Sequence, residues 1–113
     1  MVGGVKTEAG KGRVIPISDK VMPLVRKRYN KENRFFIDMT YPAYSRHFKE
    51  LMDKLGMEHL PHDCRHTFAS MANTAGVNPT SVKLIMGHAS QDLTERVYTH
   101  KAVEELISAV NMI

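Results

Sequence analysis

Three glycines, each placed just after an apolar stretch with helical spacing, most strongly limit how this chain can fold. They are Gly56, Gly76 and Gly87. Glycine is favoured immediately after a helix because it adopts the left-handed backbone conformation without a steric cost. We therefore predict short helices over residues 41–55, from Pro61 to about residue 75, and over residues 79–86, with tight turns between them.

The stretch before Gly56 gives the clearest helical pattern. Tyr44, Phe48, Leu51, Met52 and Leu55 recur at the spacing that places side chains on one face of a helix. Such a stripe is far more often part of a hydrophobic core than a ligand-binding surface. We predict that it is core.

Turn and cap residues complete the predicted architecture. Residues 2–7 and 12–17 are β-type runs around a turn, which predicts a hairpin. Helices are predicted from Ser18 to about residue 29, from Asn78-Pro79, and from Ser90 through Tyr98. A last helix carries an apolar face that covers the chain's own core or docks on a neighbouring protomer: Val103, Leu106, Ile107 and Val110. The predicted fold class is mainly α (α+β), with a small N-terminal β-hairpin.

The composition bounds the class of protein. A chain of 113 residues is long enough for one domain with one modest core. No apolar run approaches the roughly 20 residues that span a bilayer, and the first residues contain no hydrophobic signal core. The single cysteine, Cys64, excludes an internal disulfide, fits a cytoplasmic location and is interpreted as a small buried apolar residue.

Positive charge is concentrated in the first half of the chain, and the net charge is +4. A basic surface attracts polyanions such as nucleic acids. The alternative is a solvated basic surface without a partner. The basic residues of this half are Lys6, Lys11, Arg13, Lys20, Arg26, Lys27, Arg28, Lys31, Arg34, Arg46 and Lys49.

Several histidines fall close together at residues 59–66, which raises the possibility of a zinc site. His62 and His66 share a helix face, and the segment resembles a degenerate zinc-protease motif with aspartate in place of the usual glutamate. A catalytic zinc also needs a third protein ligand, which His59 would have to supply. Arg65 lies between the candidate ligands and would oppose a cation, so a metal site is the weaker hypothesis.

A phosphate-binding site explains the same region better. Arginine can hold two phosphate oxygens with its planar fork, and histidine can add a hydrogen bond. His62 and Arg65 lie three positions apart in the first turn of a predicted helix, where the helix dipole also favours an anion. His88 follows a second helix, and Tyr98 supplies a phenol that can attack phosphorus if it is activated.

These segments resemble the signature motifs of the tyrosine recombinase family, the phage integrase group. The matching segments are LPHDCRHTFAS, IMGHAS and ERVYTH, and the resemblance covers essentially the whole chain. It implies the helical catalytic domain of that family. It also implies that double-stranded DNA is cleaved and rejoined, that protomers act as a tetramer on DNA, and that neither a metal, ATP nor a membrane is involved.

The resemblance assigns a role to each residue of the motifs. Tyr98 matches the nucleophile that becomes linked to the DNA 3′ end and releases a 5′ hydroxyl. Arg65 matches the second of two arginines that clamp the phosphate, His62 begins the same motif, and His88 hydrogen-bonds the phosphate. Lys6 matches the lysine that protonates the leaving oxygen, with Lys11 as the alternative if the hairpin alignment shifts.

The chain departs from the family pattern at its start. The family's first active-site arginine and its DNA-binding region precede the lysine hairpin, where this sequence has only Met1. We therefore expect residues 1–113 to be the carboxy-terminal portion of a catalytic domain, with negligible strand cleavage on its own. A DNA-binding module without catalysis is the alternative. A lesser departure is Leu60, where relatives often carry a threonine that caps the following helix.

Overall fold

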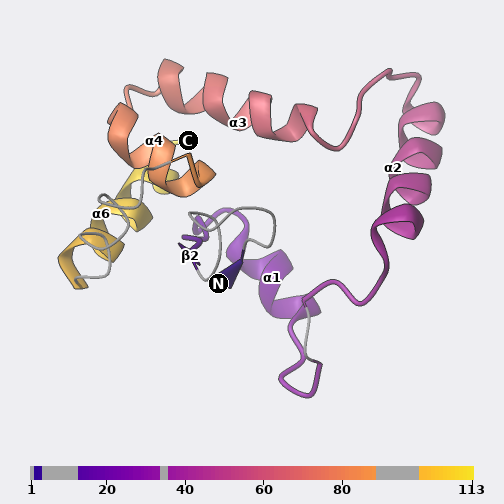
Figure 1. Ribbon diagram of the computed structural model, residues 1–113, viewed down its shortest axis with the longest axis horizontal. Helices are drawn as coiled ribbons and strands as arrows, with labels where there is room; N and C mark the ends of the chain where they lie inside the picture. The colour runs from indigo at the N-terminus through magenta and orange to yellow at the C-terminus, as the bar shows by residue number, and fades with distance from the viewer. Residues whose placement is uncertain (1, 4–12, 34–35, 89–99) are drawn as a thin grey trace.

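The helices lie close to where the glycine pattern predicts them in a computed structural model, which describes residues 2–3, 13–33, 36–88 and 100–113. This part of the protein is mainly helical, as predicted (Figure 1). The first helix begins at Met22, later than predicted, because residues 18–21 form a turn. The helices are α1 (Met22–Arg28), α2 (Tyr41–Leu55), α3 (Asp63–Thr74), α4 (Pro79–Met86) and α6 (His100–Asn111).

Two short strands lie near the N-terminus. β1 (Val2–Gly3) pairs antiparallel with β2 (Arg13–Val14), with Val2 opposite Val14. The residues between them, 4–12, lie outside the described residues, as do residues 89–99. The N-terminal hairpin and the short helix predicted to carry Tyr98 therefore stay predictions.

The predicted caps explain where two of the helices end. Gly56 and Gly87 follow α2 and α4 in the left-handed conformation, with φ angles of 63° and 71°. At the start of α4, the Asn78 side chain accepts a hydrogen bond of 2.8 Å from the Thr80 N–H. Pro79 then occupies the first turn, where no intrahelical N–H is needed.

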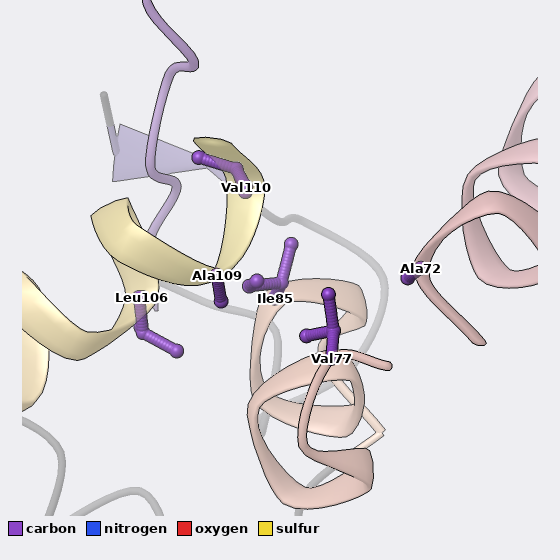
Figure 2. Packing of buried hydrophobic residues seen from close by; sticks show 6 residues of the cluster. All are labelled: Ala72, Val77, Ile85, Leu106, Ala109 and Val110. Carbon is purple, nitrogen blue, oxygen red and sulfur yellow. The ribbon is translucent and has the colours of Figure 1, made fainter. Parts of the chain in front are cut away.

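The hydrophobic core is formed by α3, α4 and α6. α4 packs against both of the other helices. Figure 2 shows α6 and the α4 region meeting through short aliphatic side chains. Leu106 and Val110 of α6 are buried here, so this face covers the chain's own core, although Ile107 remains 40% exposed. The buried residues are Ala72, Val77, Ile85, Leu106, Ala109 and Val110.

The prediction that the α2 stripe is core is wrong. No residue of α2 is buried, and Leu51 and Leu55 are 50% and 58% exposed. Figure 1 shows α2 standing apart from α4 and α6. A groove of about 610 Å³ lies between α2 and α3, lined in part by Phe48, Met52 and Met71. The apolar spacing set which face of α2 is hydrophobic, but it did not determine what packs against that face.

The segment before α1 is joined to the end of α6. The Asp19 N–H donates to the Asn111 side-chain oxygen at 2.8 Å, and the Asn111 amide donates back to the Asp19 carboxylate at 3.1 Å. Lys20 Nζ donates to the Ile113 carbonyl at 2.6 Å. We call the Asp19–Asn111 pair the terminal clasp, because it brings together residues 92 positions apart.

Candidate phosphate-binding site

The first turn of α3 is closed by an aspartate. The Asp63 carboxylate accepts a hydrogen bond of 2.9 Å from the Leu60 N–H, and the Asp63 N–H donates to the Leu60 carbonyl, also at 2.9 Å. This pair of bonds closes the turn that leads into α3. The N-cap position of the helix is His62, whose side chain makes no cap hydrogen bond.

The same hydrogen bond influences the ionisation of Asp63. The Leu60 N–H stabilises the carboxylate and is the largest cause that lowers the pKa of Asp63 below its ordinary value. His59 contributes in the same direction, with its Nδ1 at 3.5 Å from the carboxylate. Asp63 is thus held as an anion at the start of the helix that carries Arg65.

Arg65 projects from α3 to the end of α4. Its Nη2 donates to the Met86 carbonyl at 2.6 Å and contacts His88 Nε2 at 2.5 Å. Arginine cannot accept a hydrogen bond, so Nε2 of His88 must be the acceptor and the ring proton is assigned to Nδ1. The Met86 carbonyl lies at the negative end of the α4 dipole, which favours a cation.

The turn after α4 places His88 beside this guanidinium. Gly87 adopts a left-handed conformation with φ of 71° and ψ of 30°. The His88 N–H then donates to the Lys83 carbonyl at 2.9 Å, and the Gly87 N–H donates to the Leu84 carbonyl at 3.0 Å. These two bonds form the usual glycine-terminated helix end and orient the chain toward Arg65.

Two of the predicted site residues, Arg65 and His88, therefore meet in the described part of the chain. His62 lies at the start of α3, and its ring packs edge-on against His66 with centroids 5.1 Å apart. The Arg65 N–H donates to the His62 carbonyl at 3.0 Å, but within the described ranges no side-chain hydrogen bond links His62 to Arg65 or His88. Tyr98, Lys6 and Lys11 fall outside those ranges, so their predicted roles stay predictions.

The structure corrects the interpretation of Cys64 and shows where the histidines of the suggested zinc site lie. Cys64 is exposed, not buried: it lies in the first turn of α3 and lines the open groove between α2 and α3. In residues 2–3, 13–33, 36–88 and 100–113, no cluster of three or more histidine, cysteine, aspartate or glutamate side chains could hold a metal ion. His59 instead faces Asp63, while His62 packs on His66.

Sequence reasoning missed two parts of this site. The hydrogen bond from the Leu60 N–H to Asp63 could have been predicted from the sequence, since an acidic residue two positions after Pro61 is typical of the first turn of a helix. Nothing in the sequence indicates that Arg65 donates to the Met86 carbonyl. Every residue has a main-chain carbonyl, and only the fold determines which of them lies within reach of the guanidinium.

A second feature of the surface is the basic end of α1. Arg26, Lys27 and Arg28 occupy its last turn, and all are exposed. No acidic residue lies in the first turn of α1. The part of the chain that the structure describes contains no helix long and apolar enough to cross a membrane.

Comparisons with known proteins agree with the motifs. Residues 3–105 match the phage integrase family. The chain is 30% identical over 102 residues to Tyrosine recombinase XerA of Saccharolobus solfataricus, covering 88% of this chain and 35% of that protein. It is 33% identical over 108 residues to the Integrase of Escherichia phage P2, covering 96% of this chain and 31% of that protein.

A mobile-element protein is also similar. The transposase from transposon Tn916 of Enterococcus faecalis is 34% identical over 86 residues, covering 75% of this chain and 21% of that protein. The chain spans about a third of the length of the first two relatives. No solved structure matches.

Proposed function

Because the chain belongs to the phage integrase family, we propose that it is part of a tyrosine recombinase that cleaves and rejoins double-stranded DNA. Integration, excision and resolution of DNA all use this chemistry. The observation that carries the proposal is the contact between Arg65 and His88, residues from two helices that the family motifs assign to one DNA phosphate.

The hydrogen bonds of Arg65 leave most of its fork available for that phosphate. Nη2 has two hydrogens, which serve the Met86 carbonyl and His88. Nη1 and Nε then keep three hydrogens, which can each donate to a phosphate oxygen. They do not form a parallel pair, because each parallel N–H pair of a guanidinium includes an Nη2 hydrogen. His88 keeps its Nδ1–H as a donor. The contact thus fixes the guanidinium and leaves three of its five donors for the substrate.

Catalysis follows from charge placed around the phosphorus. The Tyr98 phenol gives its proton to a neighbouring base and attacks the scissile phosphate, a tyrosyl–phosphate bond to the DNA 3′ end forms, and the bond to the 5′ oxygen breaks. Lys6, on the proposed hairpin, donates a proton to that leaving oxygen, and His62 and His88 hydrogen-bond the phosphate. Arg65 stabilises the charge that develops on the phosphate oxygens. The bond energy is retained in the intermediate, so the reaction consumes no ATP.

The protein would act as part of a larger assembly. We propose that residues 1–113 form the carboxy-terminal portion of a catalytic domain, which agrees with the order of the motifs and with the length of the relatives. Its partners are duplex DNA and further recombinase protomers. A protein with these partners works on the nucleoid in the cytoplasm.

A duplex whose 3′ end carries a p-nitrophenyl phosphodiester tests the proposed site. The phenolate leaves without a proton donor, so the assay isolates the nucleophile and the groups that hold the phosphate. Cleavage of ordinary duplex DNA by this chain alone should be negligible, but we expect slow phenolate release from this activated substrate together with stable attachment of the DNA to the protein. Arg65→Ala should slow release by about 10²–10³-fold, because one preorganised donor is lost.

The matched control is Cys64→Ser, which changes an exposed side chain next to Arg65 in the same helical turn. It should release phenolate at the rate of the unchanged chain. Equal rates for the Arg65→Ala and unchanged chains would contradict the proposed role of Arg65. Loss of attachment in Cys64→Ser would show that the thiol, and not a phenol, is the nucleophile.

The basic end of α1 favours DNA binding without chemistry as a second candidate function. Three adjacent exposed cations can neutralise DNA phosphates, and the affinity of such binding falls steeply with salt. Affinity for duplex DNA that falls with salt, without any covalent attachment, would favour this candidate. Affinity that is unchanged between low and moderate salt would exclude it.

A further inference from the structure

A groove between α4 and α6 has an apolar floor and an acidic rim. It has a volume of about 450 Å³, and its lining includes Val77, Ala109 and Met112 together with Glu104 and Glu105. Glu105, Ala109 and Met112 are spaced at i, i+4 and i+7, so they form one stripe along α6. We call this surface the α4–α6 groove.

Among the described residues, the lining of the groove carries only negative charge. Glu104 and Glu105 are both exposed, and no lysine, arginine or histidine is among the residues that line the groove. Neither carboxylate forms an ion pair within the described residues. Met112 is 53% exposed in the same surface. A surface of this kind repels DNA phosphates and suits a partner with an apolar side chain between cations.

α1 carries a surface of the opposite character. Leu24 is 68% exposed, and Lys27 and Arg28 follow it at i+3 and i+4, so the three side chains share one helix face. An apolar side chain thus lies beside two cations. No hydrogen bond or ion pair joins these side chains to the α4–α6 groove of the same chain in its described part.

We propose that the α4–α6 groove receives the α1 helix of a second copy of this chain. Leu24 of one copy packs on Met112 and the apolar floor of the next, while Lys27 and Arg28 meet the two glutamates. The two surfaces differ, so the contact is head-to-tail and each copy keeps one free groove and one free α1. Such contacts continue from copy to copy and generate a ring or a filament. The proposal does not depend on the DNA chemistry.

Charge reversal tests the pairing in DNA-free solution. One variant reverses the groove (Glu104→Arg, Glu105→Arg), and another reverses the helix (Lys27→Glu, Arg28→Glu). All four positions are exposed, so circular dichroism should show that both variants fold. Sedimentation velocity at low salt should show self-association of the unchanged chain. Each variant alone should associate about tenfold more weakly or less, because like charges face each other.

An equimolar mixture of the two variants is the decisive measurement. The reversed charges complement each other, so association should return to the level of the unchanged chain. The matched control mixes the helix-reversed variant with Glu50→Gln, Glu58→Gln, Glu104→Gln, Glu105→Gln, which changes the net charge as much as the groove reversal does but places no cation in the groove. Equal recovery in the control would show general charge attraction and overturn the proposal.

Two further results would also overturn it. A chain that stays monomeric at every concentration leaves the groove to a different basic protein. Self-association that neither reversal weakens must use another surface, such as the exposed apolar face of α2. A Leu24→Asp variant tests the apolar contact separately from the ion pairs. It should weaken association although Lys27, Arg28 and the two glutamates are unchanged.

Discussion

A single guanidinium nitrogen joins α3 to the end of α4. Arg65 Nη2 donates both to the Met86 carbonyl and to His88, so one side chain stabilises the fold and positions a second predicted ligand. Structural and functional effects of changing this residue therefore have to be measured separately. The unfolding free energy reports the first, and phosphate chemistry reports the second.

Arg65→Ala should lower the free energy of unfolding by about 1–3 kcal/mol, because hydrogen bonds from a charged donor are lost and the Met86 carbonyl loses its Arg65 donor. Urea denaturation measures the change. The control is Arg46→Ala on α2, which replaces an exposed arginine and should alter stability by no more than about 0.5 kcal/mol. Equal effects of the two changes would mean that the Arg65 contacts contribute nothing.

Asp63 gives the protein a predictable response to acid. Its pKa is lowered in the folded state, first by the Leu60 N–H and then by His59. The stabilisation is therefore complete above the unfolded-state pKa, which is about 3.9, and is lost as the pH falls through the lower folded-state value. The difference in denaturation midpoint between the unchanged chain and Asp63→Asn should therefore shrink as the pH falls below the unfolded-state pKa. A constant difference would contradict this assignment.

At the scale of elements, the glycine, asparagine and proline positions predicted where α2 ends and where α4 begins and ends. Gly56 and Gly87 end α2 and α4, and Asn78-Pro79 begins α4, because caps and left-handed turns depend on local backbone chemistry. Burial was not predictable in the same way. Leu51 and Leu55 have core spacing and remain half-exposed, since burial depends on elements that are distant in sequence.

Gly87 tests whether a helix end positions His88. Gly87→Ala should destabilise the chain by about 1–2 kcal/mol, because the left-handed conformation at φ of 71° brings Cβ too close to the next carbonyl. Asparagine tolerates this conformation better, so Gly87→Asn should cost less. Denaturation in urea measures both variants. If alanine is as stable as glycine, the turn does not require a left-handed residue.

At the scale of the whole molecule, the chain is more open than its length suggests. Its radius of gyration is 15.2 Å, whereas a compact domain of this length has a value of about 13 Å. α2 stands apart, while the terminal clasp draws the segment before α1 onto the end of α6 (Figure 1). The helices α3, α4 and α6 therefore form the stable centre that holds Arg65 and His88.

The terminal clasp should control local opening of the segment before α1. Asn111→Ala removes the acceptor for the Asp19 N–H, so this amide should exchange with solvent faster. The free energy of unfolding should fall by about 1 kcal/mol or less, because the Asp19–Asn111 pair is exposed. Hydrogen exchange measures the effect. Asn73→Ala on α3 is the control, and unchanged exchange at Asp19 in Asn111→Ala would contradict the clasp.

The candidate site was predicted in part for a physical reason. Arg65, His62 and His88 carry recognisable side-chain chemistry at fixed spacing, so the sequence alone could propose them as site residues. The Met86 carbonyl and the tautomer of His88 follow only from the way α3 meets the end of α4. Motif chemistry is local in the sequence, whereas hydrogen-bond geometry is a property of the packed helices.

The central claim is that a phenol of this chain attacks a DNA phosphate, and peptide mapping of the DNA-linked protein tests it most directly. After reaction with the p-nitrophenyl duplex, mass spectrometry of the digested adduct should place the nucleotide on Tyr98, and Tyr98→Phe should give no adduct. A nucleotide on Cys64 or a histidine, or an adduct that persists in Tyr98→Phe, would contradict the account.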